Sequence, residues 1–513
     1  MTQKRNFQVI LFSSSPESNN IHKIYGIHRM STEMRLQGFT CQVVHFYTHF
    51  TDDELKKIIQ NLVGNRTLVI GFSSTFFSWG PTDDQINILK KANLIMDYAK
   101  LINLKVKFIL GGANPFSMTN PINGISLKKV DAIFDGFPEY FVSKYINALY
   151  NDLEIPVPTK ISKMGLPVYV PSEYDFDFST SQIIYAPEDY VDSEESVVLE
   201  VARGCIFKCS FCTFRLNGKK KLDYIKDPEV LREELMRNYN DYKIKYYIIS
   251  DDTFNDSTEK LRMLHAVFTS LPFKIKFSTY LRLDLLYHNR EQIQLLKEMG
   301  LVGAMFGVES FHDEAARSVG KGLTGEKSKM LLDDLKKIHW GDQVKIEVAL
   351  ITGLPYETLE SYEETKRWIE DQTKDIDLVR VNFLRIDNPD TARNKSQLSV
   401  FAQNASKYGY YWKDGQQEWH NNKSEVTNSQ QADDLRLELD TLARKSFKFA
   451  HGGFTLFGLW NQLQKTNISK VTFDDLLNMN RKEFVSWRSQ VVHPNLEKIR
   501  QDYIKHYKRN FGL

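Results

Sequence analysis

Three of the chain's four cysteines lie within eight positions of one another, soon after an apolar run that begins at Val197. Cys205, Cys209 and Cys212 have the spacing C-x3-C-x2-C. Three thiolates on one short loop can ligate three irons of a cubane [4Fe-4S] cluster and leave the fourth iron without a protein ligand. An open iron can bind a chelating cofactor and pass an electron to it. The spacing therefore predicts redox chemistry at this loop.

Two other kinds of protein could account for a cysteine cluster. A structural zinc site needs four ligands, and no fourth cysteine or histidine lies close to the motif in the sequence. A small ferredoxin ligates all four irons and is much shorter than 513 residues. The remaining cysteine, Cys41, falls in a predicted strand, where a small buried thiol is the common interpretation. The open cluster is favoured, and the two alternatives remain as competing hypotheses.

Six predicted strands with helical intervals surround this motif and indicate a partial barrel. They are expected at residues 197–202, 244–250, 275–279, 302–308, 346–351 and 378–384. Polar residues or glycine follow four of the later strands, and these are Asp251, Asp252, Arg282, Glu309, Ser310 and Gly353. Because the carboxyl ends of barrel strands meet at one edge, we expect these residues to face the cysteine loop.

Ordinary structural roles stay open for some of these positions. Asp251 or Asp252 could cap a helix that is predicted to begin near Ser257. The guanidinium of Arg282 could bind the carboxylate of a ligand, or it could pair with Asp284. The sequence alone does not choose between these roles.

The cysteine motif, with the aromatic Phe211 before its last cysteine, resembles the signature of the radical S-adenosylmethionine (SAM) superfamily. Gly307 to Ser310 resembles the G-[IV]-E-S segment of that family, and Gly353 to Thr358 resembles its G-L-P-x-E-T turn. The resemblance implies a partial (β/α)6 barrel in which a [4Fe-4S] cluster cleaves SAM reductively to a 5′-deoxyadenosyl radical. It also implies an electron donor such as flavodoxin or ferredoxin. The residues that it places at SAM are Phe211, Asp251, Asp252, Arg282, Glu309, Ser310 and Gly353.

The first 150 residues alternate between predicted strands and helices, which indicates a Rossmann-like, doubly wound parallel sheet. This part resembles the cobalamin-binding domain that precedes the barrel in a large radical SAM subfamily. The resemblance implies possible cobalamin contacts at Ser73, Ser74, Gly111, Gly112 and Asn114. One departure concerns the D-x-H-x-x-G signature that supplies a histidine to cobalt, because residues 13–17 read Ser-Ser-Ser-Pro-Glu instead. His22 and His28 come later, on a predicted helix, where surface or packing roles are more common.

The positions of prolines and the loss of the strand pattern indicate the domain boundaries. Pro156, Pro158, Pro167, Pro171 and Pro187 interrupt residues 151–195, which we expect to link the first domain to a barrel over residues 196–395. Residues 396–513 are predicted to form a mostly helical cap, with helices at 432–449 and 473–488. The expected fold class is thus α/β throughout, followed by this cap.

The charge balance excludes some partners. A formal net charge of +2 gives no strong attraction to nucleic acid, and the basic tail 498–509 is more typical of a solvated amphipathic helix than of an RNA-binding patch. No secretory signal and no apolar stretch of membrane-spanning length is found in the sequence, so a cytoplasmic protein without a membrane segment is expected.

Three functions remain in view. The first is a cobalamin-dependent radical SAM methyltransferase, and the second is a cobalamin-free radical SAM enzyme whose first domain is a scaffold. The third, of another class, is a non-catalytic structural metal-binding protein. The substrate, a small molecule or a peptide, is not identified by any motif.

Overall fold

The computed structural model describes most of residues 6–446 and several positions near the C-terminus. The residues outside the description are 1–5, 15–22, 76, 80–81, 113, 173–175, 192, 194–195, 215, 372–375, 393–397, 414–415, 447–482, 484–500, 503, 506, 510 and 512. The contacts divide the chain into two compact units. The first comprises Met1–Asp177, Ser181–Asp192 and Leu496–Leu513, and the second comprises Phe178–Thr180 and Ser193–Asn495.

The first unit is built on a seven-stranded sheet with the order β2-β1-β3-β4-β5-β7-β6. All neighbouring strands are parallel except β6, which runs antiparallel to β7. The strands are β1 (Val9–Ser13), β2 (Cys41–His45), β3 (Val69–Ser73), β4 (Lys107–Gly112), β5 (Ala132–Asp135), β6 (Lys160–Ile161) and β7 (Pro167–Tyr169). The last two come from the proline-rich stretch that the sequence suggests is a connection.

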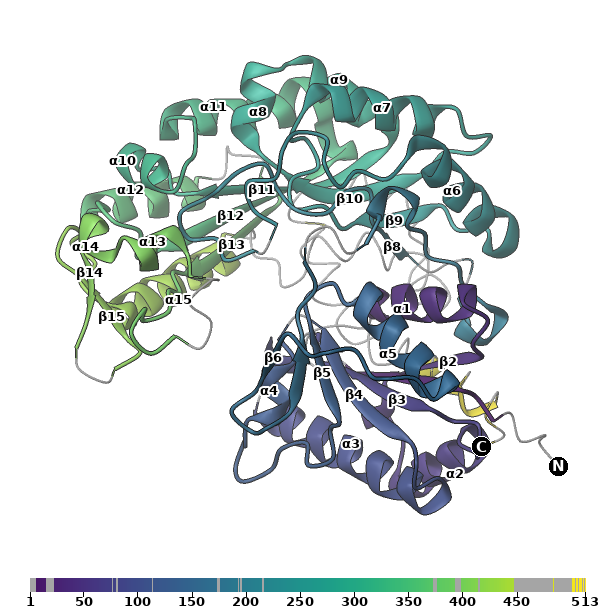
Figure 1. Cartoon of the computed structure of the whole chain (residues 1–513). Helices are drawn as coiled ribbons and strands as arrows, with labels where there is room; N and C mark the ends of the chain where they lie inside the picture. Colours follow the sequence, from purple (N-terminus) through teal and green to yellow (C-terminus); the bar gives the residue numbers. More distant parts are fainter. Residues whose placement is uncertain are drawn as a thin grey trace. The chain divides into compact units, whose positions relative to one another are not determined.

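Helices cover both faces of this sheet, as expected for a doubly wound fold (Figure 1). One core is formed with α2 (Asp52–Leu62) and α3 (Thr82–Ile102), and the opposite core with α1 (Tyr25–Leu36) and α5 (Glu139–Asn151). A short helix, α4 (Phe116–Thr119), follows β4. Thr51 begins α2 with a capping box, since its hydroxyl accepts from the Glu54 N–H and the Glu54 carboxylate accepts from the Thr51 N–H.

Residues near the C-terminus belong to the first unit. The side chains of Ile504, Tyr507 and Phe511 are buried in the same core as α2 and α3. Lys508 forms an ion pair with Glu54 at 2.6 Å. The apolar residues of the basic tail therefore pack against this unit.

The second unit contains a six-stranded, wholly parallel sheet in the sequential order β13-β12-β11-β10-β9-β8. The strands are β8 (Val197–Leu199), β9 (Tyr246–Ile249), β10 (Lys276–Leu281), β11 (Leu301–Glu309), β12 (Lys345–Thr352) and β13 (Leu378–Phe383). All six coincide with the strands predicted from the sequence, and the expected α/β fold class is confirmed.

Helices connect successive strands along one face of this sheet (Figure 1). They are α6 (Pro228–Tyr242), α7 (Thr258–Thr269), α8 (Leu283–His288), α9 (Glu291–Met299), α10 (Asp313–Ser318), α11 (Gly325–Asp334) and α12 (Leu359–Glu370). Phe306 of β11 stacks on Trp340 on this helical side, with ring centroids 6.2 Å apart. Because strand side chains alternate between faces, residues 305 and 307 point to the opposite, inner face.

The region beyond residue 396 is only partly described. It contains α13 (Val400–Gln403), α14 (Ala405–Tyr408), α15 (Ser429–Lys445) and an antiparallel hairpin of β14 (Tyr410–Trp412) and β15 (Trp419–Asn421). The hairpin is an addition to the helical cap expected from the sequence, and the predicted helix 473–488 lies almost wholly outside the described residues. Among the helices that are described, none is long and apolar enough to cross a lipid bilayer.

Candidate active site

The cysteine loop begins directly beyond β8, the first strand of the six-stranded sheet. The N–H of Cys205 donates to the carbonyl of Leu216 (3.0 Å), and the N–H of Gly218 donates to the carbonyl of Cys205 (2.7 Å). The N–H of Cys212 donates to the carbonyl of Cys209 (2.9 Å). These bonds bring the two halves of the loop side by side and fix the cysteine motif in a compact turn.

Contacts with distant segments hold the loop in place. The Ser210 hydroxyl donates to the carbonyl of Ser318 (2.7 Å), and the N–H of Phe401 donates to the carbonyl of Ser210 (2.9 Å). Gly204 has a φ of +79°, and a Cβ at this position would lie 2.5 Å from the Cβ of Leu216. Only glycine meets both requirements at the start of the loop.

N–H donors reach two of the three sulfur atoms of the motif, and the Thr253 hydroxyl, which donates to the carbonyl of Asp252, lies close to one of them. The hydroxyl of Thr253 lies 3.2 Å from Cys205 Sγ, and the N–H of Phe207 donates to the same sulfur at 3.4 Å. Arg282 Nη1 donates to Cys209 Sγ at 3.4 Å. All four cysteines of the chain are free thiols. Donors of this kind stabilise thiolates, so these residues fit an iron–sulfur cluster by their type and spacing. Among the described residues, no three cysteine, histidine, aspartate or glutamate side chains are already arranged around a metal position.

Asp251 is committed to a buried ion pair at the end of β9. Its carboxylate lies 2.6 Å from Lys260 Nζ, which also lies 3.1 Å from Asp256 Oδ1 and donates to the carbonyl of Thr253. All four residues are buried. The cap of α7 is the Ser257 side chain, so neither Asp251 nor Asp252 has the capping role that the sequence left open.

Asp252 differs from its neighbour because its side chain is partly exposed to solvent. Its Oδ2 accepts a hydrogen bond from the N–H of Gly204 at 3.1 Å, which links the turn after β9 to the cysteine loop. Surrounding protein atoms still displace much of its hydration and, together with the Asp251 charge, raise the pKa of Asp252 to about 7. Asp252 is thus an acid directed toward the loop without a cationic partner in an ion pair within the described chain.

Arg282 links the cysteine loop to the end of β10. Its Nε and Nη2 donate to the two carboxylate oxygens of Asp284 at 3.0 and 2.6 Å, and its guanidinium lies 3.9 Å from the ring centroid of Phe207. With Nη1 on Cys209, the guanidinium is engaged on every side. Of the two roles that the sequence left open, the structure shows the pairing with Asp284.

Glu309 ends β11 in the left-handed conformation, with φ at +69°. Lys321 Nζ lies 3.2 Å from its Oε1 and donates to the carbonyl of Gly307 at 2.6 Å. A Cβ on Gly307 would lie 2.4 Å from Glu309 Oε1, so glycine allows the carboxylate to fold back along the strand. Left-handed residues other than glycine cost about 1–3 kcal/mol and cluster at functional sites.

Ser310 takes part in a buried network behind this rim. Its hydroxyl donates to Glu357 Oε1 at 2.7 Å, and the hydroxyl of Tyr362 donates to the other carboxylate oxygen. Burial raises the pKa of Glu357 to about 7, although both hydroxyls favour the ionised form. The network fixes the turn between β12 and α12 to the end of β11.

The surroundings of Gly353 are filled by protein atoms. Its φ is +87°, and a Cβ there would lie 2.8 Å from both Ala432 Cβ and the ring of Trp419. Its N–H donates to the hydroxyl of Tyr362 and its carbonyl accepts from the hydroxyl of Tyr410, each at 2.8 Å. The glycine is therefore required where the C-terminal hairpin packs on the barrel rim.

The remaining residue predicted for SAM is Phe211, which is half-buried and directly precedes Cys212.

Two residues that the sequence reasoning missed lie on the inner face of the sheet. Arg380 of β13 donates from Nε to Glu347 Oε1 of β12 at 2.6 Å. Glu347 is 2% exposed, and its Oε2 has no hydrogen-bond partner within the described chain. Tyr280 and Met305 are in register with Glu347 across β10 and β11. The sequence does hold a signal for them, because Glu347 and Arg380 are charged residues within otherwise apolar stretches of their strands.

In the first unit, the candidate cobalamin residues gather at the carboxyl ends of β3 and β4. The N–H of Ser74 donates to the carbonyl of Gly111 at 2.8 Å, and Ser74 Oγ is buried without a partner among the described residues. Gly112, with φ at +117°, leaves room for Ser74 and Thr75, whereas a Cβ on Gly111 would meet only ordinary contacts. Asn114 is exposed nearby. An orphaned hydroxyl beside an uncrowded glycine fits a ligand at this edge.

The histidines near the same edge bind each other. His45 Nε2 lies 2.8 Å from His28 Nε2, and His45 Nδ1 lies 2.6 Å from the hydroxyl of Ser13. Burial and the neighbouring His28 lower the pKa of His45. Behind them, burial would raise the pKa of Asp189, but bonds from Arg35 and His28 lower it below its ordinary value. His22 lies outside the described residues.

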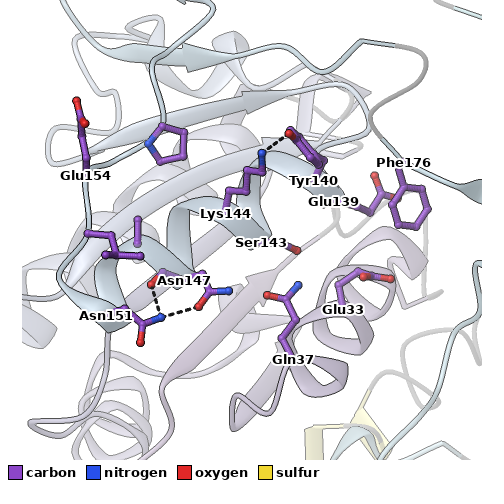
Figure 2. A pocket seen from close by; sticks show the side chains of 13 residues that line it. Glu33, Gln37, Glu139, Tyr140, Ser143, Lys144, Asn147, Asn151, Glu154 and Phe176 are labelled. Atoms are coloured by element: carbon purple, nitrogen blue, oxygen red, sulfur yellow. Dashed lines mark hydrogen bonds between the residues drawn. The ribbon is translucent and has the colours of Figure 1, made fainter.

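A separate pocket of about 730 Å³ lies between α1 and α5 in the first unit (Figure 2). Its lining mixes apolar and polar side chains, and among the latter Lys144 is bonded to the Tyr140 hydroxyl and Asn151 Nδ2 donates to Asn147 Oδ1 at 2.8 Å. It contains none of the residues predicted for SAM, cobalamin or the cluster, and we assign it no role.

Comparison with known proteins agrees with the barrel and its cysteine loop. The family model described as the Radical SAM superfamily matches residues 199–369. The anaerobic magnesium-protoporphyrin IX monomethyl ester cyclase of Cereibacter sphaeroides is 26% identical over 179 residues, 34% of this chain and 28% of the relative. The ribosomal protein uS12 methylthiotransferase RimO of Christiangramia forsetii is 26% identical over 214 residues, 40% and 45% of the two chains. The chain thus spans less than half the length of these relatives.

Two solved structures share the fold over both units. The radical SAM methyltransferase TsrM from Kitasatospora setae, with tryptophan and a SAM analogue bound, superposes with a TM-score of 0.57 at 16% identity over 74% of each chain. The cobalamin-dependent SAM radical enzyme OxsB, with aqua-cobalamin and SAM bound, superposes with a TM-score of 0.56 at 14% identity over 98% of this chain and 72% of that one. Residues 199–369 match the radical SAM superfamily model, and the chain shares its fold with a radical SAM methyltransferase and with a cobalamin-dependent SAM radical enzyme.

Proposed function

We propose that the chain is a radical SAM enzyme. Cys205, Cys209 and Cys212 would hold a [4Fe-4S] cluster, and SAM would chelate its open iron. When bound, the cluster supplies the electron that breaks a carbon–sulfur bond of SAM and releases a 5′-deoxyadenosyl radical. The observation that carries the proposal is a single loop at the barrel edge with three free thiols, two of whose sulfurs lie within reach of Arg282 and Thr253.

The contacts of the rim residues suggest how SAM is held. We assign the SAM ammonium to Asp252, because Asp251 is already neutralised by Lys260. Glu309 would accept hydrogen bonds from the ribose, since its carboxylate is held at the rim by Lys321. Phe211 would flank the bound cofactor. Three other residues would not contact SAM but would hold the rim in place. Ser310 would do so through the Glu357 network, Gly353 through the hairpin, and Arg282 through the cysteine loop.

For the reaction, we favour cobalamin-dependent methyl transfer to a carbon or phosphorus centre. The fold shared with the methyltransferase TsrM supports this choice, as does the glycine and hydroxyl edge of the first unit. Ser73, Ser74, Gly111, Gly112 and Asn114 would line the corrinoid, and His28 and His45 would not ligate cobalt because they bind each other. The alternatives are a cobalamin-free radical SAM reaction and a non-catalytic metal-binding protein.

The substrate, a small molecule or a peptide, would lie against the inner face of the six-stranded sheet. Arg380 presents donors there, and Glu347 Oε2 is an acceptor without a partner within the described chain. An unpartnered buried acceptor costs about 1–3 kcal/mol, so a bound group that donates to it is favoured. The half-exposed Tyr280 flanks this pair.

Anaerobic reconstitution of the whole chain tests the proposal. We expect about four irons per chain, as one cubane cluster requires, and SAM-dependent 5′-deoxyadenosine after reduction with dithionite. Cys209→Ala should lose both, whereas the matched Cys41→Ala, at the cysteine outside the motif, should keep both. A cluster-loaded wild-type chain that cleaves no SAM, or a Cys209→Ala variant that still cleaves it, would refute the proposal.

Supplying cobalamin during the same purification separates the two enzymatic alternatives. Methyl transfer predicts a bound corrinoid spectrum and S-adenosylhomocysteine as a product. A scaffold role for the first unit predicts neither, and 5′-deoxyadenosine would then form without a corrinoid requirement.

The compartment and the reductant are part of the proposal. Four free cysteines suit a reducing compartment such as the cytoplasm. A protein that delivers single electrons, such as flavodoxin or ferredoxin, would reduce the cluster.

A further inference from the structure

The cysteine loop carries a concentration of positive charge that the site chemistry does not use. Residues 203–222 contain six basic residues and no acidic residue, in a chain whose formal net charge is +2. Arg203 is buried and paired with Glu200 at 3.0 Å. Lys208, Lys220 and Lys221, in contrast, are exposed.

These exposed lysines lie on adjacent parts of one surface. A Cβ on Gly218 would lie 1.9 Å from Lys208 Cε, so the stem of Lys208 crosses the second half of the loop. The N–H of Lys219 donates to the carbonyl of Cys205 at 3.2 Å, which places residues 219–221 beside the first cysteine. We call Lys208, Phe214, Lys220 and Lys221 the loop patch.

The loop patch is next to the proposed cluster. Lys208 directly precedes Cys209, so their Cα atoms are about 3.8 Å apart. Phe214 follows Cys212 by two residues and is 40% exposed. The cysteines at 209 and 212 are themselves only half-buried. A protein seated on the loop patch would therefore approach the cluster closely.

Stabilisation of the thiolates does not account for the outer lysines. Arg282 already donates to Cys209 from a buried position. Exposed charges are screened by salt and contribute little to local stability. Lys221 pairs with Glu259, but no ion pair is formed by Lys208 or Lys220 within the described chain. Exposed charges of one sign do, however, steer an oppositely charged protein to its docking site.

We propose that the loop patch is the docking surface of an acidic flavodoxin-type electron donor. This inference rests on the proposed radical SAM function. Lys208 and Lys220 would attract the acidic surface of the donor, and Phe214 would contact the apolar edge of its flavin. In the transfer, the flavin hydroquinone of the donor would lose one electron and become the semiquinone, and the electron would pass to the cluster that Cys205, Cys209 and Cys212 would hold.

The choice of a flavoprotein follows from Phe214. Electron-transfer complexes bury small interfaces, so the few residues around the redox centre determine their affinity. Aromatic residues are enriched at the centre of interfaces, and flat rings favour offset stacking. A ferredoxin, which presents an iron–sulfur loop rather than a ring, is the alternative occupant to be distinguished by experiment.

Charge reversal with a matched control tests the proposal. Lys208→Glu/Lys220→Glu is compared with Lys245→Glu/Lys274→Glu, which makes the same charge change at exposed residues just before β9 and β10, at the opposite end of the same sheet. The reconstituted full chain is reduced either by dithionite or by a bacterial flavodoxin with its reductase, and the rate of 5′-deoxyadenosine formation is measured at low and high salt.

We expect the first variant to lose about tenfold or more of the flavodoxin-driven rate at low salt, within the range of electrostatic steering. Its dithionite-driven rate and iron content should match wild type, and the control should match wild type in every assay. Equal flavodoxin-driven rates in the two variants would overturn the proposal. A loss seen with ferredoxin but not with flavodoxin would also overturn it.

A direct binding measurement keeps the test valid if the substitutions distort the cysteine loop and abolish turnover. The affinity of oxidised flavodoxin for each variant is measured by calorimetry, which does not depend on turnover. Weaker binding to Lys208→Glu/Lys220→Glu alone supports the loop patch, and unchanged binding refutes it. If wild type cleaves SAM with dithionite but binds flavodoxin no more tightly than Lys208→Glu/Lys220→Glu does, the docking surface fails while the radical SAM function stands.

Discussion

At the carboxyl edge of the six-stranded sheet, charged side chains hold one another in fixed positions. Lys260 lies between Asp251 and Asp256, and Lys321 holds Glu309. At the same edge of the seven-stranded sheet, the chain instead presents glycine backbone and hydroxyl groups, while its charged pair, Arg35 with Asp189, stands behind a neutral His45. The first edge suits a small, charged cofactor, and the second suits a large ligand that contacts backbone over a wide area.

The largest loss of stability is expected at Asp251, and it should distinguish this carboxylate from its neighbour Asp252 at the barrel edge. Asp251→Asn removes one partner of the fully buried Lys260, and the loss of a buried pair costs roughly 3–5 kcal/mol. Because Asp256 remains near the lysine, we expect the lower end of this range. The shift of the urea midpoint measures it.

Asp252→Asn is the matched control for that variant. It should change the urea midpoint little, because the side chain is partly exposed and has no cationic partner in an ion pair within the described chain. SAM affinity should instead fall about tenfold or more, as for the loss of a hydrogen bond to a charged group. If both variants unfold at the same urea concentration, the division between a structural and a ligand-binding carboxylate is wrong.

A pH effect should come from Glu357, behind the same edge. Its pKa is raised from 4.5 to about 7, so the folded state keeps a proton that the unfolded state has lost between these values. The free energy of unfolding should therefore fall as the pH rises from about 4.5 to about 7, by at most about 3 kcal/mol.

Glu357→Gln should remove most of this slope. The comparison of urea midpoints at pH 5 and pH 7.5 measures it in both proteins. Asp252, whose pKa is also about 7, contributes a smaller slope of the same sign because it is partly exposed. A slope that is unchanged in Glu357→Gln would assign the effect to other groups.

In the first unit, Asp189→Asn should be milder than Asp251→Asn. Asp189 accepts two hydrogen bonds from Arg35, at 2.5 and 2.9 Å, but Arg35 is partly exposed and can regain water. We expect a loss of about 2 kcal/mol, below the range for fully buried pairs. Thermal unfolding of the variant checks this, and a loss as large as that of Asp251→Asn would remove the contrast between the two units.

The smallest effect on stability is expected at Gly111. Its φ is an ordinary one, and an added Cβ would meet Phe134 at 3.5 Å, so Gly111→Ala should change stability by less than about 0.5 kcal/mol. The methyl group would nevertheless occupy the strand end at which we propose cobalamin. Corrinoid uptake should fall while the melting temperature holds, and uptake equal to wild type would place the ligand elsewhere.

Much of the fold could be predicted from apolar runs, since all six barrel strands and the alternation of strands and helices in the first 150 residues follow directly from them. The strands β6 and β7 could not, because prolines mark both connections and edge strands. The end of the chain could not be assigned to the first unit either, since Tyr507 and Phe511 are buried there by residues hundreds of positions away.

The sequence predicts where the site lies better than it predicts what each residue does there. The cysteine spacing identifies the loop, but the sequence cannot tell which of Asp251 and Asp252 is paired with a cation, because Lys260 reaches Asp251 only after α7 has formed. Likewise, Gly353 suggests room for a ligand until Trp419, from a distant hairpin, is seen beside it. Roles that depend on such long-range contacts require the structure.

The burial of Ile504, Tyr507 and Phe511 in the core of the first unit has a consequence for synthesis in the cell. The ribosome makes the seven strands of that unit long before it makes these side chains. Until then, the face that they cover stays exposed on the nascent chain, while the whole barrel is translated and folds. The first unit therefore completes its core only after the barrel has been synthesised, which makes this interval the stage at which a chaperone would be needed.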